Sequence, residues 1–174
     1  YHPAYEVTSS YRLPDGRCHL AFARVGSDPG DPDPGQVLTA VFHRAEQDDL
    51  LDRVATVDLT GLGLARVPPE VLCLPRLSAL HLGGNQLTEV PADIGRLTDL
   101  TTLVLAQNNL ESLPREIERL DKLTALNLSD NRFESVPPAV FRLPALTALH
   151  LERNDLRDPA LPPEIGGLRN LTSL

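Results

Sequence analysis

The stretch LTTLVLAQNNLESLPREIERLDK, residues 100–122, decides the fold, because the next 23 residues repeat its pattern with different residues between the fixed positions. Leucine occupies positions 1, 4 and 6 of the stretch, asparagine occupies position 9, and Leu-Pro occupies positions 14 and 15. The same register extends outward to residues 54–76, 77–99, 123–145 and 146–170. Four of these five units have 23 residues and the last has 25. Such a fixed period predicts a stack of similar structural units.

Each unit carries the period of two that is typical of a short strand, centred on positions 3 to 7. Leucines at positions 4 and 6, such as Leu103 and Leu105, are predicted to face inward, whereas positions 3, 5 and 7 face outward. Proline at position 15 predicts the first residue of a helical turn. Apolar residues at positions 18 and 21, such as Ile117 and Leu120, are predicted to pack back against the strands.

Asparagine at position 9 predicts a ladder of buried amides, because a buried amide needs backbone partners that the neighbouring turns can supply. The predicted ladder consists of Asn85, Asn108, Asn131 and Asn154. In the first unit Leu62 takes the place of this asparagine. We therefore expect Asn85 to matter less than Asn108 or Asn131. Residues 171–174 begin a sixth unit, and we expect the natural protein to continue beyond it.

These units resemble the leucine-rich repeat family, whose core pattern is LxxLxLxxNxL, and specifically its 23-residue subclass ending in LPxxIxxL. The resemblance covers residues 54–174. It implies an α/β fold: a leucine-rich repeat solenoid with a curved parallel sheet and with coil or short helical turns on the convex side. It also implies that a partner binds the concave face, which positions 3, 5 and 7 line.

Residues 1–53 do not follow the repeat, and we expect them to form a small α+β capping segment. Two runs of strand-favouring residues flank Pro14-Asp15-Gly16, which predicts a hairpin. Apolar residues at helical spacing predict a helix near 36–52 that covers the open end of the solenoid. The expected division is therefore a cap at 1–53 and repeats at 54–174.

Composition disfavours several classes of function. The net charge is −8, and the repeats carry eleven Lys and Arg against fifteen Asp and Glu, which argues against nucleic acid as a partner. There is no signal-peptide pattern and no apolar run long enough to insert into a membrane. Two cysteines do not make a disulfide framework, so we expect a cytoplasmic protein.

Candidate binding residues are the polar ones at outward-facing positions 5 and 7 and at the adjoining position 8. They are Asp58, His81, Gln107, Asn127, His150, Glu152 and Arg153. These positions contain no aromatic residue, although aromatic residues are the usual anchors of a strong protein interface. Histidines in general titrate near neutrality, so partner binding is expected to vary between about pH 5 and pH 8.

Catalytic and metal sites are not expected. His81 and His150 are three units apart, which is roughly 14 Å at one strand spacing per unit and too far for two ligands of one zinc ion. Asp58 and His81 are neighbours across adjacent strands, and we interpret them as a polar pair that lacks a third metal ligand. No phosphate-binding loop, HExxH, CxxC or GxSxG motif is present, and no cofactor is implied.

Two functions therefore stay open. The first is a non-catalytic scaffold or adaptor that recognises a protein or peptide through the concave face. The second is the sensing arm of a larger signalling enzyme whose GTPase, kinase or ubiquitin-ligase domain lies outside residues 1–174. The open reading frame beyond Leu174 would discriminate between them.

Overall fold

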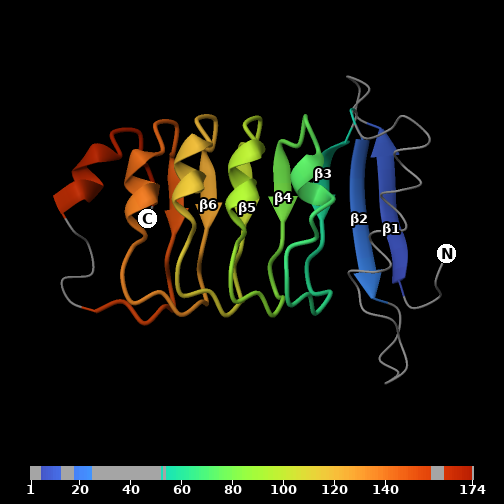
Figure 1. Ribbon diagram of the computed structural model, residues 1–174, viewed down its shortest axis with the longest axis horizontal. Helices are drawn as coiled ribbons and strands as arrows, with labels where there is room; N and C mark the ends of the chain where they lie inside the picture. Colours follow the sequence, from blue (N-terminus) through green and yellow to red (C-terminus); the bar gives the residue numbers. More distant parts are fainter. Residues whose placement is uncertain (1–4, 13–17, 25–51, 53, 158–162, 174) are drawn as a thin grey trace.

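The computed structural model describes residues 5–12, 18–24, 52, 54–157 and 163–173. Its strands form one seven-stranded sheet whose spatial order follows the order in the chain, from β1 to β7 (Figure 1). Short 3-10 helices accompany the strands of the repeats, one for each unit. Residues distant in the sequence therefore meet mainly across neighbouring units of the stack.

The five repeat strands pair in parallel, each displaced by one unit from the last. They are β3 (Val54–Asp58), β4 (Ala79–His81), β5 (Thr102–Val104), β6 (Ala125–Asn127) and β7 (Ala148–His150). From β4 onward the strands cover positions 3 to 5 and are shorter than the predicted span of 3 to 7. Backbone bonds nevertheless continue past them: Leu82 N donates to Val104 O at 2.8 Å, and Gly84 N donates to Ala106 O at 2.9 Å.

Each unit returns through a 3-10 helix, as the LPxxIxxL segments predicted. The helices are η2 (Val71–Cys73), η3 (Ala92–Arg96), η4 (Arg115–Arg119), η5 (Pro138–Arg142) and η6 (Pro163–Gly167). The position-15 proline does not occupy the first helical residue. Pro91 and Pro114 directly precede η3 and η4 in extended conformations. Their carbonyl oxygens accept the first bonds of the turns, from Ile94 and Ile117 at 3.0 and 3.2 Å.

The core lies between the strands and the 3-10 helices. The leucines at positions 4 and 6 of the third and fourth units are completely buried, as are Ile117 and Leu120. These predictions are confirmed. At Gly95 the turns approach closely, because a Cβ added there would lie 2.7 Å from the carbonyl oxygen of Glu116. A side chain at this point would separate η3 from η4.

The asparagine ladder is present in all four units predicted to carry it, but Asn154 is only half-buried, whereas the other three amides are buried. Asn108 Oδ1 accepts from Leu87 N at 3.0 Å, and its Nδ2 donates to the carbonyl oxygens of Leu82, Leu105 and Ala106 at 2.9, 3.0 and 3.2 Å. The side chain therefore joins its own turn to the preceding unit. Asn131 makes the corresponding four bonds, and both residues are more than nine-tenths buried.

Asn85 makes the same set of hydrogen bonds as Asn108 and Asn131, so its contacts give no reason for it to matter less. It accepts from Leu64 N at 3.0 Å and donates to Leu59 O at 2.9 Å, both in the first unit. It also bonds to the carbonyl oxygens of its own turn. The reason is that this ladder runs from side chain to backbone. The missing asparagine at Leu62 therefore removes no partner of Asn85.

A second ladder, which we did not predict, runs through the hydroxyl groups at position 2. Thr101 Oγ1 donates to Ser78 O at 2.9 Å, and Thr124 Oγ1 donates to Thr101 O at 3.0 Å. The pattern continues in both directions along the stack, through Ser78, Thr147 and Thr172. Its sequence signal is the recurrence of Ser or Thr directly after the first leucine of each unit after the first.

The predicted N-terminal hairpin is confirmed in part. Strands β1 (Tyr5–Arg12) and β2 (Cys18–Arg24) pair antiparallel, and β2 pairs in parallel with β3. The hairpin therefore extends the repeat sheet at its N-terminal edge, which the sequence did not indicate. The predicted helix near 36–52 lies outside the described residues except for residue 52.

Candidate recognition surface

The outward side of the repeat strands forms one continuous surface, which we call the sheet face. It consists of positions 3, 5, 7 and 8 of the five units. Pairing places Asp58, His81, Val104, Asn127 and His150 side by side at position 5. All five are half-buried, because each side chain is flanked by a neighbour on the adjacent strand. Polar groups of distant repeats are thereby gathered in one row.

Asp58 and His81 do not form the predicted pair. Asp58 Oδ1 accepts from the backbone N of Thr60 at 3.0 Å, and no hydrogen bond or ion pair joins it to His81 in the described part of the chain. A backbone N–H two residues away is a nearer partner for a short aspartate side chain than a ring on the next strand. His81 lies in register between Asp58 and Val104.

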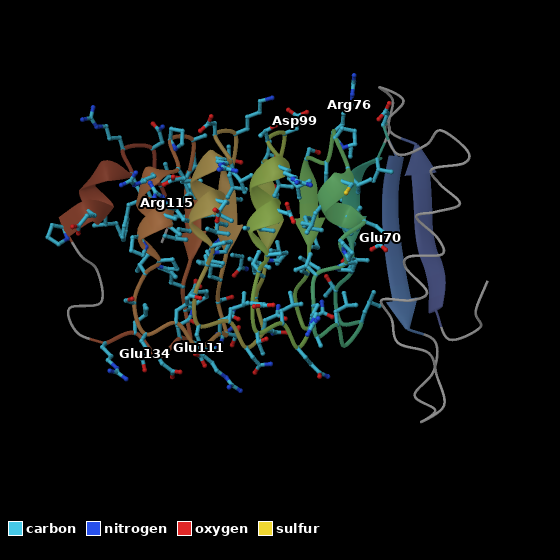
Figure 2. All side chains as sticks on the ribbon, in the orientation of Figure 1. Glu70, Arg76, Asp99, Glu111, Arg115 and Glu134 are labelled. Atoms are coloured by element: carbon cyan, nitrogen blue, oxygen red, sulfur yellow. The ribbon has the colours of Figure 1, made fainter. Side chains whose placement is uncertain are left out.

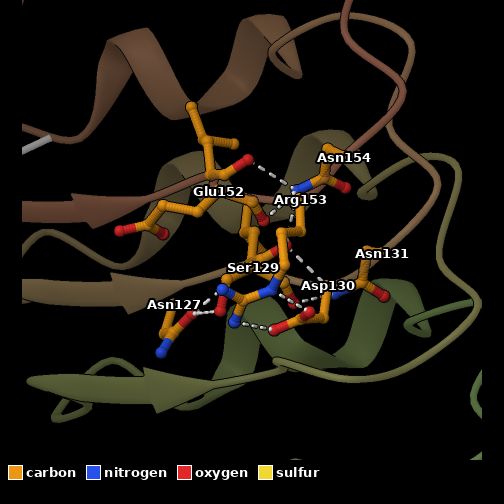
Figure 3. A network of polar contacts seen from close by, with 9 residues as sticks. Asn127, Ser129, Asp130, Asn131, Glu152, Arg153 and Asn154 are labelled. Atoms are coloured by element: carbon orange, nitrogen blue, oxygen red, sulfur yellow. Dashed lines mark hydrogen bonds and ion pairs between the residues drawn. The ribbon is translucent and has the colours of Figure 1, made fainter.

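Asn127 repeats the local geometry of Asp58 on β6. Its Oδ1 accepts from the backbone N of Ser129 at 3.0 Å and from Ser129 Oγ at 2.7 Å. The side chain is therefore fixed against its own strand end, as Figure 3 shows. Ser129 was not among the predicted binding residues. It is buried, and both its N–H and its hydroxyl group donate to Asn127.

His150 and Glu152 lie together near the C-terminal end of the sheet face. His150 Nδ1 lies 3.4 Å from Glu152 Oε1, and the two side chains are 39% and 53% exposed. The pKa of the Glu152 carboxyl is lowered, first by its own backbone N–H and then by the hydrogen bond with His150. His150 and Glu152, two of the three predicted residues of the last full unit, thus form one contacting pair with an anionic end.

Arg153 binds Asp130 across the boundary between the fourth and fifth units. Its Nη2 lies 2.7 Å from Asp130 Oδ2, and its Nε bonds to Oδ1 of the same carboxylate (Figure 3). This hydrogen bonding lowers the pKa of Asp130 and raises that of Arg153. Asp130 was not predicted as a binding residue. The signal for it was an opposite charge at the same position of adjacent units.

Position 8 has a left-handed backbone throughout the stack. The first two units place glycines there, Gly61 and Gly84, at φ of 71° and 65°. The next three place Gln107, Asp130 and Arg153 there, with φ between 53° and 56°. Residues with a Cβ are uncommon in this region. The exposed amide of Gln107 is therefore presented at the rim of the sheet face by the turn that precedes the buried asparagine.

The sheet face offers hydrogen-bonding and charged groups rather than a catalytic arrangement. Among the described residues, His, Cys, Asp and Glu side chains do not gather in groups of three or more that could hold a metal ion. The sheet face has mostly small residues at positions 3 and 7. Its carboxylates, amides, imidazoles and one guanidinium lie at positions 5, 7 and 8. This chemistry suits recognition of another polar chain.

The family model described as leucine rich repeat matches residues 75–133 and 121–174. No curated protein matches the chain. Among solved structures, a leucine-rich repeat protein of Leptospira interrogans is 37% identical with a TM-score of 0.69 and covers 72% of this chain. A TDR receptor is 27% identical with a TM-score of 0.61 over 70% of this chain.

A third structure, that of PEPR1-AtPEP1, is 25% identical with a TM-score of 0.56 over 71% of this chain. All three proteins are much longer. The chain spans 32%, 22% and 17% of their respective lengths. Within the described ranges of this chain, none of the helical segments has the length and apolar content needed to cross a bilayer.

Proposed function

The chain belongs to the leucine-rich repeat family, and from this premise we propose that it is a non-catalytic module that binds a protein segment or peptide on its sheet face. Domains of this family generally mediate protein–protein recognition. The proposal adds that the partner is held by the polar groups of positions 5, 7 and 8, as part of a scaffold or adaptor.

The observation that supports this face is the fixed orientation of its exposed polar groups. Arg153 is held by two nitrogen atoms against Asp130, and Asn127 is held by Ser129. Side chains that are already ordered lose less conformational entropy when a partner binds. The face therefore combines exposure with preorganisation, although it has no aromatic anchor.

The test compares two matched double variants of the full-length protein. His150→Ala with Glu152→Ala removes a contacting pair from the sheet face, and we expect it to weaken partner capture. Arg115→Ala with Glu118→Ala removes a contacting pair, 3.2 Å apart, from η4 on the opposite side and should leave capture unchanged. Loss of capture in the η4 variant, with capture retained in the sheet variant, would show that the wrong face was chosen.

We also propose that nucleic acid is not the partner. The net charge of −8 and the excess of carboxylates on the sheet face support this, because phosphate contacts need clustered positive charge. A mobility-shift assay at low salt should show no complex with random DNA or RNA. A complex that dissociates as salt is added would contradict the proposal.

We propose a cytoplasmic location. Cys73 is a free, exposed thiol, and such thiols are kept reduced in the cytosol. Immunolocalisation of the tagged full-length protein should place it inside the cell. Recovery of the protein mainly from the culture medium would overturn this proposal.

A further inference from the structure

We propose that the occupant of the sheet face is an extended basic polypeptide segment whose two cationic side chains lie about six residues apart, one at Asp58 and the other at Glu152. The inference rests on the proposed function and deepens it by assigning the charge of the partner and the spacing of its charged groups. Charge complementarity between the two surfaces carries it.

The charges of the sheet face are unequal. It carries three carboxylates, of Asp58, Asp130 and Glu152, against one guanidinium, that of Arg153. Arg153 is already engaged by Asp130 through two bonds. The positive charge of the face is therefore neutralised within the protein, and the negative charge that remains lies at Asp58 and Glu152.

Neither remaining carboxylate forms an ion pair with a Lys or Arg side chain in the described residues, although the charge of Arg153 helps to lower the pKa of Glu152. Asp58 is bonded to the backbone N–H of Thr60, and Glu152 lies against an imidazole that is charged only when protonated. Several carboxylates outside this face do have such a cation: Lys122 Nζ lies 2.5 Å from Asp99, and Arg157 bonds to Glu134. Figure 2 shows Asp99 and Glu134 at opposite edges of the stack.

The positions of the two carboxylates set the spacing of the partner's charges. Asp58 belongs to β3, and Glu152 follows β7, so four strand spacings separate them. At about 4.8 Å for each strand, and with the offset from position 5 to position 7, the separation is about 20 Å. An extended chain advances about 3.3 Å for each residue, so about six residues span this distance.

The surface between the two carboxylates permits close approach of an extended backbone. Both rows that flank position 5 consist of small residues at this point. Position 3 presents Thr56, Ala79, Thr102, Ala125 and Ala148, and position 7 presents Gly83, Ala106 and Ser129 between the first and last units. Amides at Gln107 and Asn127 lie along the path and can bond to a peptide backbone.

The experiment selects peptides from a random library of about twelve residues displayed on phage, with the full chain as bait. Selected sequences are then synthesised, and their affinities are measured by fluorescence anisotropy. We expect enrichment of peptides with two Lys or Arg about six residues apart. Their affinity should fall by about fivefold in the double variant Asp58→Asn with Glu152→Gln, because exposed ion pairs contribute modestly. Raising NaCl from about 0.1 M to about 0.5 M should weaken binding in the same direction.

The matched control is Glu89→Gln with Asp121→Asn, which removes the same charge from exposed positions outside the sheet face and should not change affinity. Ala125→Tyr, in the middle of the sheet face, should block any occupant regardless of its charge. Selected peptides that are neutral or acidic, or that bind the Asp58/Glu152 variant normally, would overturn the charge inference alone. Peptides that still bind the Ala125→Tyr variant, or a library that yields no binder, would overturn the proposed function as well.

Discussion

Arg153 and Asp130 form a hydrogen-bonded ion pair between two adjacent units of the stack, and both residues have left-handed backbone conformations, at φ of 53° and 54°. The ion pair therefore joins two residues whose backbone conformation is strained for any residue other than glycine. It also uses the only guanidinium on the sheet face. Its electrostatic consequence can be measured directly.

We predict that the ion pair with Arg153 keeps Asp130 ionised at a lower pH than an aspartate without a cationic partner. Because Arg153 lowers the folded-state pKa of Asp130, the pair stabilises the fold above the unfolded pKa of about 4. That stability is lost as the pH falls through the lowered folded pKa. Carboxyl-carbon NMR should show Asp130 titrating higher in Arg153→Gln than in the wild type. Arg157→Gln, which breaks the pair with Glu134, should leave Asp130 unchanged, and an unchanged Asp130 in Arg153→Gln would refute the prediction.

The asparagine ladder predicts three similar losses of stability. Asn85→Ala, Asn108→Ala and Asn131→Ala each leave a buried backbone N–H and several carbonyl oxygens without their side-chain partner, which costs about 1–3 kcal/mol. Denaturant melts should place the three variants close together. A much smaller loss for Asn85→Ala would restore the expectation drawn from Leu62, and losses below about 0.5 kcal/mol at all three would contradict the ladder.

The hydroxyl ladder is expected to contribute less. Thr101 O accepts from Thr124 Oγ1, but it also accepts from Thr124 N at 2.9 Å and Ala125 N at 3.0 Å. Thr124→Val therefore leaves no acceptor unsatisfied, and we predict a loss below about 1 kcal/mol. Urea unfolding of Thr124→Val beside Asn131→Ala provides the comparison. An equal loss in the two variants would show that the hydroxyl bonds are not redundant.

Gly95 should tolerate no side chain. A Cβ at this position would lie 2.7 Å from Glu116 O and 2.9 Å from Glu116 Cβ, so η3 and η4 must move apart. We predict that Gly95→Ala costs about 1–3 kcal/mol in thermal or chemical unfolding. Gly166→Ala is the matched control, because nothing lies within 4 Å of its Cβ position. If both substitutions have the same effect, the close approach is not what Gly95 provides.

The repeat made the fold predictable because each feature recurs in a fixed register. Leu103 and Leu126, or Asn108 and Asn131, are the same position in successive units, so their burial follows from the period alone. The sequence also carried the hydroxyl ladder, visible as Ser or Thr at position 2, but its partners are backbone groups that no residue type reveals. The attachment of β2 to β3 was hidden for the same reason.

The sheet face was less predictable because its contacts depend on competition between partners. Asp58 faced a choice between His81 and the nearer backbone N–H of Thr60, and the local bond prevails. Asp130 and Arg153 meet at position 8 of adjacent units, where both have the same left-handed conformation. Neither outcome follows from the alternation of inward and outward residues.

Both ladders run in the same direction, from the side chains of each unit to the backbone of the unit before it. Asn85 and Ser78 both reach back to the unit before them, and each later unit repeats those backward bonds. Each later unit therefore carries the side chains that bond it to the preceding unit. The preceding unit contributes only backbone groups to these bonds. Duplication of residues 100–122 in tandem would supply the bonds of both ladders for the new copy. A copy of residues 54–76 in the interior would supply neither, since Leu62 and Ala55 stand where the amide and hydroxyl are required. The stack can therefore be lengthened by duplicating one of its later units but not its first unit.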